Sequence, residues 1–315
     1  MPWYIPVGIS AFLFVSALII SYVCFYKTFL KREPKNQEEY PIPKSEEYAP
    51  FRELMIKWMD DYKTIPHKDV EIRSFDGLTL RGKYYELTPD APLEILFHGY
   101  RGDSYRDLSG GISRCFEMGH SALIVDHRAA GRSEGRVISF SANESRDCAA
   151  WVDFAINNIN KDAKIILTGI SMGAATVMVA SAMDLPENVV GVLADCGFSS
   201  CKNIVKKVVR DMGHPADIIY PFVRLGGMLF GRFDSKKASP VDALRSCKLP
   251  VIFIHGDTDT FVPFQMSVDN YNACASEYKR LITIEGAGHG LCYPVNMQKY
   301  KDEVEAFFKP LLENN

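Results

Sequence analysis

The sequence has few of the features that mark nucleotide-, metal- or nucleic-acid-binding proteins. It contains no G-x-x-x-x-G-K-[ST] P-loop, and the "GAGHG" near its C-terminus lacks the G-x-G-x-x-G spacing of a dinucleotide site. The cysteines include no C-x-x-C pair, which argues against a zinc site. Repeats and low-complexity tracts are not evident, and a net charge of −3 gives no global attraction to nucleic acid. We therefore expect no metal, no cofactor and no nucleic-acid partner.

The cysteines occur singly and mostly in apolar stretches. This distribution is typical of free, buried thiols in a reducing compartment, although an even number leaves pairing open. The eight positions are Cys24, Cys115, Cys148, Cys196, Cys201, Cys247, Cys274 and Cys292.

The N-terminal stretch is too apolar for an ordinary globular segment. Residues 5–26 contain no charged residue, and as a helix they would cover roughly 33 Å, enough to cross a bilayer core. A cleaved signal peptide is the alternative, but no Lys or Arg precedes the stretch and no small-x-small cleavage site follows it. We predict that residues 1–32 form a single-pass membrane anchor.

Basic residues follow the apolar stretch 5–26 but do not precede it. Lys27, Lys31, Arg32 and Lys35 lie on its C-terminal side, although nearby glutamates dilute the cluster. The positive-inside tendency then predicts a catalytic domain in the cytoplasm, attached to the membrane by the N-terminal helix.

After the anchor, the chain alternates between strand-like and helix-like segments. Residues 33–50 are charged and proline-rich, as in a linker, and residues 51–315 form the predicted domain. The domain opens with an amphipathic stretch, "FRELMIKWMDDY", and a hairpin signature at Asp76-Gly77. Short runs of Ile, Leu and Val then alternate with helical stretches, which predicts an α/β fold with a mostly parallel central sheet flanked by helices.

One connection is much longer than the others. Residues 199–239 join two predicted strands, and "IIYPFVRLGGMLF" within them is nearly all apolar. We predict a helical cap insertion, either a lid over a substrate pocket or a helix pair packed on the core.

A serine follows one of the predicted strands in a sequence typical of a nucleophile. Ser171 lies in "LTGISMGAA", a G-x-S-x-G pentapeptide between an apolar strand and a helix, which is the pattern of a nucleophile elbow. At such an elbow the serine sits at a helix N-terminus, where backbone N–H groups stabilise negative charge. We predict that Ser171 is a nucleophile rather than a turn residue.

A histidine and an acid complete the candidate catalytic set. His289 follows the last strand in "EGAGHG" and is the predicted base that accepts the Ser171 proton. Asp259 in "HGDTDTFVP" is the predicted acid, Asp257 is expected to shape the same loop, and Asp195 after an earlier strand is a geometric alternative. The oxyanion donors are predicted at Met172, after the nucleophile, and at Tyr100 in "FHGYRGDS".

These motifs together resemble the α/β-hydrolase superfamily over about residues 51–309. The motifs that carry the resemblance are "SFDGLTLRG", "FHGYRGDS", "DHRAAGRSEG", "TGISMGAA", "DCGFSS", "HGDTDTFVP" and "GAGHG". The sequence is most similar to membrane-anchored bacterial serine hydrolases of the BEM46-like and serine-aminopeptidase-like groups. The resemblance implies a Ser171, Asp259 and His289 triad, with oxyanion N–H groups at Tyr100 and Met172.

The predicted function is a serine hydrolase that cleaves small carboxylic esters, including lipid-like ones, through an acyl-enzyme. A peptidase or an acyl-protein thioesterase would use the same triad. A non-enzymatic binding module on the same fold is the alternative from another class, and the intact set of three residues argues against it.

Overall fold

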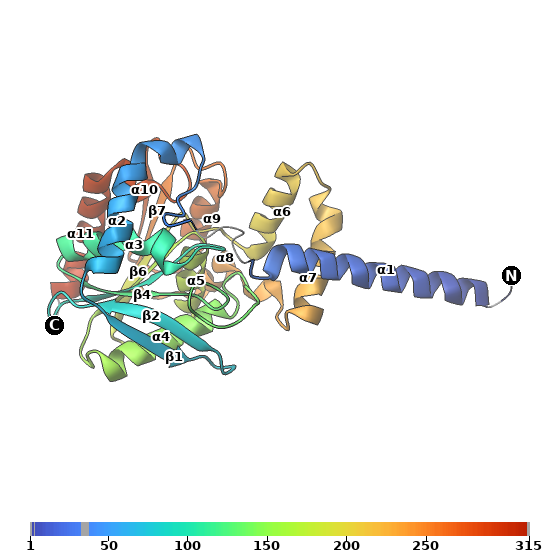
Figure 1. Cartoon of the computed structure of the whole chain (residues 1–315), viewed down its shortest axis with the longest axis horizontal. Helices are drawn as coiled ribbons and strands as arrows, with labels where there is room; N and C mark the ends of the chain where they lie inside the picture. The colour runs from blue at the N-terminus through green and yellow to red at the C-terminus, as the bar shows by residue number, and fades with distance from the viewer. Residues whose placement is uncertain (1, 3, 33–37, 314–315) are drawn as a thin grey trace.

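An eight-stranded sheet runs through the computed structural model, which describes residues 2, 4–32 and 38–313 (Figure 1). The strand order is β1-β2-β4-β3-β5-β6-β7-β8, and β2 alone runs antiparallel to its neighbours. The strands are β1 (Lys68–Arg73), β2 (Thr79–Tyr85), β3 (Leu93–Phe97), β4 (Ser121–Val125), β5 (Ile165–Ile170), β6 (Val189–Asp195), β7 (Val251–Gly256) and β8 (Lys279–Ile284). The predicted, mostly parallel sheet is confirmed.

Helices cover both faces of this sheet, because the central strands are apolar on both sides. Ile95 and Leu167 pack against α4 (Glu144–Asn158) and α5 (Met172–Ala180) on one face. Leu96 packs toward α3 (Ser104–Glu117), and Ile166 toward α11 (Met297–Glu313), on the other. Outside the insertion at residues 199–239, the remaining α-helices of the described domain are α2 (Arg52–Thr64), α8 (Pro240–Ala243), α9 (Gln265–Ala273) and α10 (Cys292–Val295).

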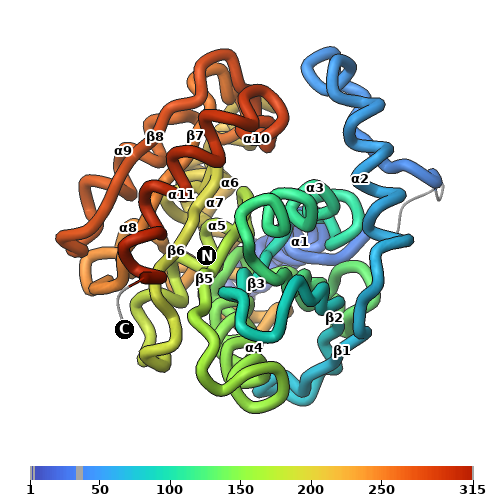
Figure 2. The backbone as a smooth tube through the Cα atoms, turned by 90° about the vertical axis from the view of Figure 1, so that its left-hand side faces the viewer, coloured from blue at the N-terminus to red at the C-terminus, as the bar shows by residue number. Residues whose placement is uncertain are grey.

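The N-terminal helix α1 (Tyr4–Phe29) projects beyond the rest of the chain (Figure 1) and lies behind the domain in the end-on view of Figure 2. By length and composition it can cross a membrane, and most of its side chains are exposed. Its position fits the predicted anchor.

The last turn of α1 is built into the domain. Phe29 is fully buried, and its ring lies 5.0 Å from the ring of Phe233 and 5.7 Å from that of Phe140. The carbonyl oxygen of Phe29 accepts a hydrogen bond from the N–H of Ile138 at 2.7 Å. This end of the helix is therefore fixed by both apolar packing and backbone bonding.

The predicted linker falls partly outside the described residues, which exclude 33–37. Its later part lies against the domain: Ile42 is buried, and a short 3-10 helix (Glu46–Phe51) leads directly into α2. Trp58, Met59 and Tyr62 bury one side of α2, as the amphipathic pattern predicts.

The insertion at residues 199–239 forms two helices, α6 (Cys201–Asp211) and α7 (Ala216–Phe230). In Figure 1, α7 crosses α1 at the base of its projecting part. The two backbones touch, since a methyl group placed on Gly226 would lie 2.4 Å from the carbonyl oxygen of Ser21. The rings of Tyr22 and Phe230 also meet edge to face at 5.2 Å between centroids.

Candidate active site

The turn that carries Ser171 is strained and tightly enclosed. Ser171 has φ 56° and ψ −112°, a conformation that an L-residue adopts only when its surroundings enforce it. A methyl group on Gly173 would lie 1.9 Å from the carbonyl oxygen of Phe97, and one on Gly169 would lie 2.2 Å from the backbone of Gly173. Only glycine fits at either position, so the G-x-S-x-G pattern follows from the close approach of β3, β5 and α5.

Ser171, His289 and Asp259 form a continuous chain of hydrogen bonds. Ser171 Oγ lies 2.9 Å from His289 Nε2, and His289 Nδ1 lies 2.7 Å from Asp259 Oδ2. Ser171 follows β5, Asp259 follows β7 and His289 follows β8. The three residues are far apart in sequence, but the carboxyl ends of these parallel strands lie on the same side of the sheet. The structure thus brings together the residues that the sequence pattern selected.

Further hydrogen bonds hold the Asp259 carboxylate in place. Its Oδ1 accepts from the N–H groups of Phe261 and Val262 at 2.9 and 2.8 Å, and its Oδ2 lies 3.1 Å from His255 Nε2. Burial alone would raise the pKa of Asp259, but the hydrogen bonds from His255 and His289 outweigh it and hold the pKa well below its ordinary value. Asp259 is therefore ionised at neutral pH, and its carboxylate accepts a hydrogen bond from His289.

The other two acids considered from the sequence lie elsewhere. Asp257 is exposed, and its Oδ1 accepts from the N–H of Gly286 at 2.7 Å, so it shapes the loop as expected. Asp195 is buried at the end of β6, its Oδ1 has no hydrogen-bond partner, and burial raises its pKa. No hydrogen bond between Asp195 and His289 is found among the described residues.

The loop with the predicted oxyanion donor lies beside Ser171. A methyl group on Gly99, the residue before Tyr100, would lie 3.5 Å from the Ser171 Cβ. The hydroxyl of Tyr100 donates to the carbonyl oxygen of Thr28 at 2.6 Å, which ties this loop to the last turn of α1. Met172, the other predicted donor, is the first residue of α5.

Two residues that brace the site were missed from the sequence. The Asp107 carboxylate, held by Arg106 at 2.6 Å, accepts from the N–H of Gly99 at 3.0 Å. The Tyr48 hydroxyl donates to the carbonyl oxygen of His289 at 2.7 Å. No motif marks either residue; their roles follow from contacts that only the folded chain shows.

A cluster that resembles a metal site overlaps this chain of hydrogen bonds. Single ligand atoms of Cys196, Asp259 and His289 lie within 4.8 Å of one another. Burial raises the pKa of the Cys196 thiol well above its ordinary value, so it stays protonated at neutral pH. Because only a thiolate binds metal well and the other two groups already bond each other, we assign no metal here.

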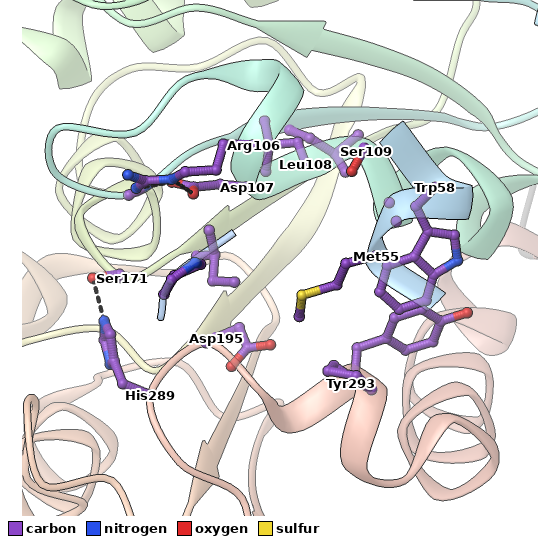
Figure 3. Close-up of a pocket in the computed structure, with 18 of the residues that line it drawn as sticks. Met55, Trp58, Arg106, Asp107, Leu108, Ser109, Ser171, Asp195, His289 and Tyr293 are labelled. Atoms are coloured by element: carbon purple, nitrogen blue, oxygen red, sulfur yellow. Dashed lines mark hydrogen bonds and ion pairs between the residues drawn. The ribbon is translucent and has the colours of Figure 1, made fainter. Parts of the chain in front are cut away.

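A cavity of about 230 Å³ leads away from Ser171 and His289. Figure 3 shows it extending past Asp195 to Met55, Trp58 and Tyr293. Apolar side chains dominate its far end, where the rings of Trp58 and Tyr293 stack at 5.5 Å. The shape and chemistry suit an apolar group attached to a reacting carbonyl.

The cavity corrects one interpretation of the insertion. Among the described residues, those that line the cavity come from positions before 200 and after 260, and none comes from residues 199–239. The insertion packs on α1 instead, while the 3-10 helix Glu46–Phe51 and α2 line the cavity where a lid was expected.

Comparison with known proteins places the chain in a family. A model of the prolyl oligopeptidase family matches residues 140–315, more than half of the chain. The chain belongs to this family. Within the α/β-hydrolase superfamily it is a BEM46-like member.

Individual relatives of this prolyl oligopeptidase family member are distant. The uncharacterized protein YqkD of Bacillus subtilis is 25% identical over 238 residues, which cover 75% of this chain and 77% of that protein. Protein bem46 of Schizosaccharomyces pombe is 24% identical over 231 residues, 71% of each chain. An esterase structure from Pyrococcus furiosus has a TM-score of 0.65 at 22% identity and covers 78% of this chain and 92% of its own, which shows a shared fold.

The opposite pKa shifts of Asp259 and Asp195 predict opposite effects of the same substitution. The depressed pKa of Asp259 contributes stability above its unfolded pKa of about 3.9, and this stability is lost as pH falls towards the folded pKa. We expect Asp259→Asn to lower the free energy of unfolding at pH 7 by about 2 kcal/mol and the difference from wild type to shrink below about pH 4.

Asp195→Asn is the matched control. The raised pKa of Asp195 penalises the folded state as pH rises, so removing the buried acid should leave stability at pH 7 unchanged or increased. The free energy of unfolding of both variants is measured by urea denaturation at pH 7 and at about pH 3.5, a value close to the pKa of an aspartate in the unfolded chain. The same sign of change at pH 7 for the two variants would contradict these assignments.

Proposed function

We propose that this α/β-hydrolase is a membrane-tethered serine hydrolase that cleaves carboxylic esters through an acyl-enzyme. The observation that carries the proposal is the chain of hydrogen bonds from Ser171 through His289 to Asp259, with Ser171 Oγ and His289 Nε2 2.9 Å apart. A nucleophile, a base and an orienting acid in this order are what acyl transfer requires.

In the first step, the Ser171 Oγ bonds to the ester carbonyl carbon while His289 Nε2 accepts the Oγ proton. Asp259 keeps the other ring nitrogen protonated and stabilises the imidazolium that forms. The N–H groups of Tyr100 and Met172 stabilise the oxyanion of the tetrahedral intermediate. The intermediate then expels the alcohol, which takes the proton from His289.

In the second step, water gives a proton to His289 and its oxygen bonds to the acyl carbon. The bond from the acyl carbon to Ser171 Oγ breaks, and His289 returns the proton to that oxygen. The carboxylic acid leaves and the enzyme is restored, so no cofactor takes part.

A peptidase is the second candidate, because the matched family model is that of the prolyl oligopeptidases. An acyl-protein thioesterase would use the same three residues. A mere binding module would not need the three residues bonded in series, which counts against that alternative.

The helix α1 supports the proposed tether. It is long and apolar enough to span a bilayer, and Lys27, Lys31 and Arg32 lie on its C-terminal side. By the positive-inside tendency we propose that the catalytic domain faces the cytoplasm. A protease added to intact cells should then leave the domain uncut. Cleavage in intact cells would show that the domain faces the outside of the cell.

Ser171→Ala should abolish covalent labelling by a fluorophosphonate probe and reduce kcat/KM for p-nitrophenyl esters by at least about 10³-fold. The reason is that the substitution removes Ser171 Oγ, the protein atom that bonds to the acyl carbon in the proposed mechanism. Ser246→Ala, at an exposed serine away from the cavity, is the matched control and should label and turn over like wild type. Labelling that survives in Ser171→Ala would refute the assignment.

A panel of p-nitrophenyl esters, thioesters and aminoacyl anilides should show the ester class hydrolysed with the highest kcat/KM. Within the esters, kcat/KM should rise by up to about fourfold for each methylene added to the acyl chain, until the chain fills the cavity. This factor is the equivalent of about 0.8 kcal/mol for each methylene buried.

Met55→Trp narrows the far end of the cavity and should therefore shift the highest kcat/KM to an ester with a shorter acyl chain. Preference for anilides would favour the peptidase, and rates that do not vary with chain length would exclude this cavity as the acyl site.

A further inference from the structure

The helix α7 carries apolar side chains on two opposite sides. One side packs on the domain through Ala216, Tyr220, Val223 and Gly227, all of them buried. The other side carries an unbroken apolar stripe at spacings of four, three and four residues, which one face of an α-helix requires. We call this stripe the outer face of α7; it consists of Ile218, Phe222, Leu225 and Leu229.

The two ends of the outer face are exposed, and its middle is partly covered by the rest of the chain. Ile218 is 67% exposed and Leu229 is 49% exposed, while Phe222 and Leu225 are half-buried. Exposure of an apolar stripe of this kind to water is unfavourable. The outer face therefore requires a partner.

The packing of α7 on α1 fixes the direction in which the outer face points. Gly226 touches the backbone at Ser21, and this contact lies between the domain-facing side of α7 and its outer face. The outer face lies opposite the side that packs on the domain and therefore points away from the domain. Figure 1 shows that α1 also projects away from the domain.

The level of this contact along α1 matches the edge of a bilayer. Residues 5–24 of α1 would cover about 30 Å, the thickness of a hydrocarbon core. Ser21, Tyr22 and Phe25, which contact α7, lie at the end of that stretch nearest the domain. A helix that crosses α1 here would lie in the plane of the membrane surface.

The surroundings of the outer face suit lipid headgroups. Met228 and Phe230 extend its apolar surface to the exposed side of Tyr22 on α1. At its other end, Asp217 is paired with Lys206 and Arg210 of α6, so this border carries no uncompensated negative charge. Apolar residues bordered by basic ones are typical of helices that lie in a membrane interface.

We propose that the outer face of α7 docks on the leaflet of the bilayer that α1 spans. The partner is the lipid surface itself, and the proposal rests on the proposed anchor role of α1. Docking would hold the domain at a fixed height and tilt. It would also place Tyr100, which bonds to Thr28 at the base of α1, next to the membrane surface. Acyl esters that partition into lipid would then reach the cavity from the interface.

The test uses the full chain in phosphatidylcholine vesicles, with an environment-sensitive fluorophore on a cysteine introduced by Ile218→Cys or Leu229→Cys. We expect severalfold stronger quenching by brominated lipids than at the control Asn157→Cys, an exposed position on α4. Aqueous iodide should show the opposite order. Labelling of the parent chain corrects for Cys24, the one native cysteine that is not buried.

Ile19→Cys, on the exposed part of α1, separates the two proposals. If position 19 is quenched by lipid and positions 218 and 229 are quenched only by iodide, the docking proposal is wrong and the anchor stands. If iodide reaches all three positions, the anchor fails as well. Protection of position 218 from both quenchers, with cross-linking between copies, would show that a second chain covers the outer face and would also overturn lipid docking.

Discussion

The strained turn at Ser171 is the constraint around which the candidate site is built. A residue with φ 56° is stable there only because β3, β5 and α5 approach so closely that Gly169 and Gly173 have no room for a side chain. The N–H of Ser171 donates to the carbonyl oxygen of Asp195 at 2.8 Å, which ties the turn to β6 as well. The parallel order β5-β6-β7-β8 then brings the ends of β7 and β8 beside the turn, so Asp259 and His289 reach the serine without any local motif joining them.

The N-terminal part of the chain braces this arrangement from two sides. Tyr48, ahead of α2, holds the backbone of the His289 loop, and Thr28, at the end of α1, holds the Tyr100 side chain. Arg101 adds a second bond on the α1 side, since its guanidinium donates to the carbonyl oxygen of Lys27 at 2.7 Å. The helix that projects from the domain and the segment that follows it are thus structural parts of the site.

The sequence could predict what depends on local pattern. Runs of Ile, Leu and Val predicted the strands, and the glycines around Ser171 predicted the turn, because burial and backbone clashes act on neighbouring residues. It predicted Asp259 as the acid but could not exclude Asp195, since both follow buried strands. Their difference lies in which carboxylate meets His289, and that depends on the order of strands in space. The same holds for Asp107 and Tyr48, whose partners lie eight and 241 residues away.

The apolar composition of the insertion did not reveal what its helix α7 packs against. The sequence of α7 is compatible with a lid, a core helix or a membrane-surface helix, because all three need apolar residues. The structure separates these roles by position. Among the described residues, those of α2 and α3 line the cavity and none of α7 does, so α7 is not a lid over it. Its buried side joins the cluster that contains Met172 and Phe29, and its glycine at 226 lets α1 approach. A helix so placed connects the projecting helix α1 to α5, the helix that begins after Ser171, and its opposite face is directed away from the domain.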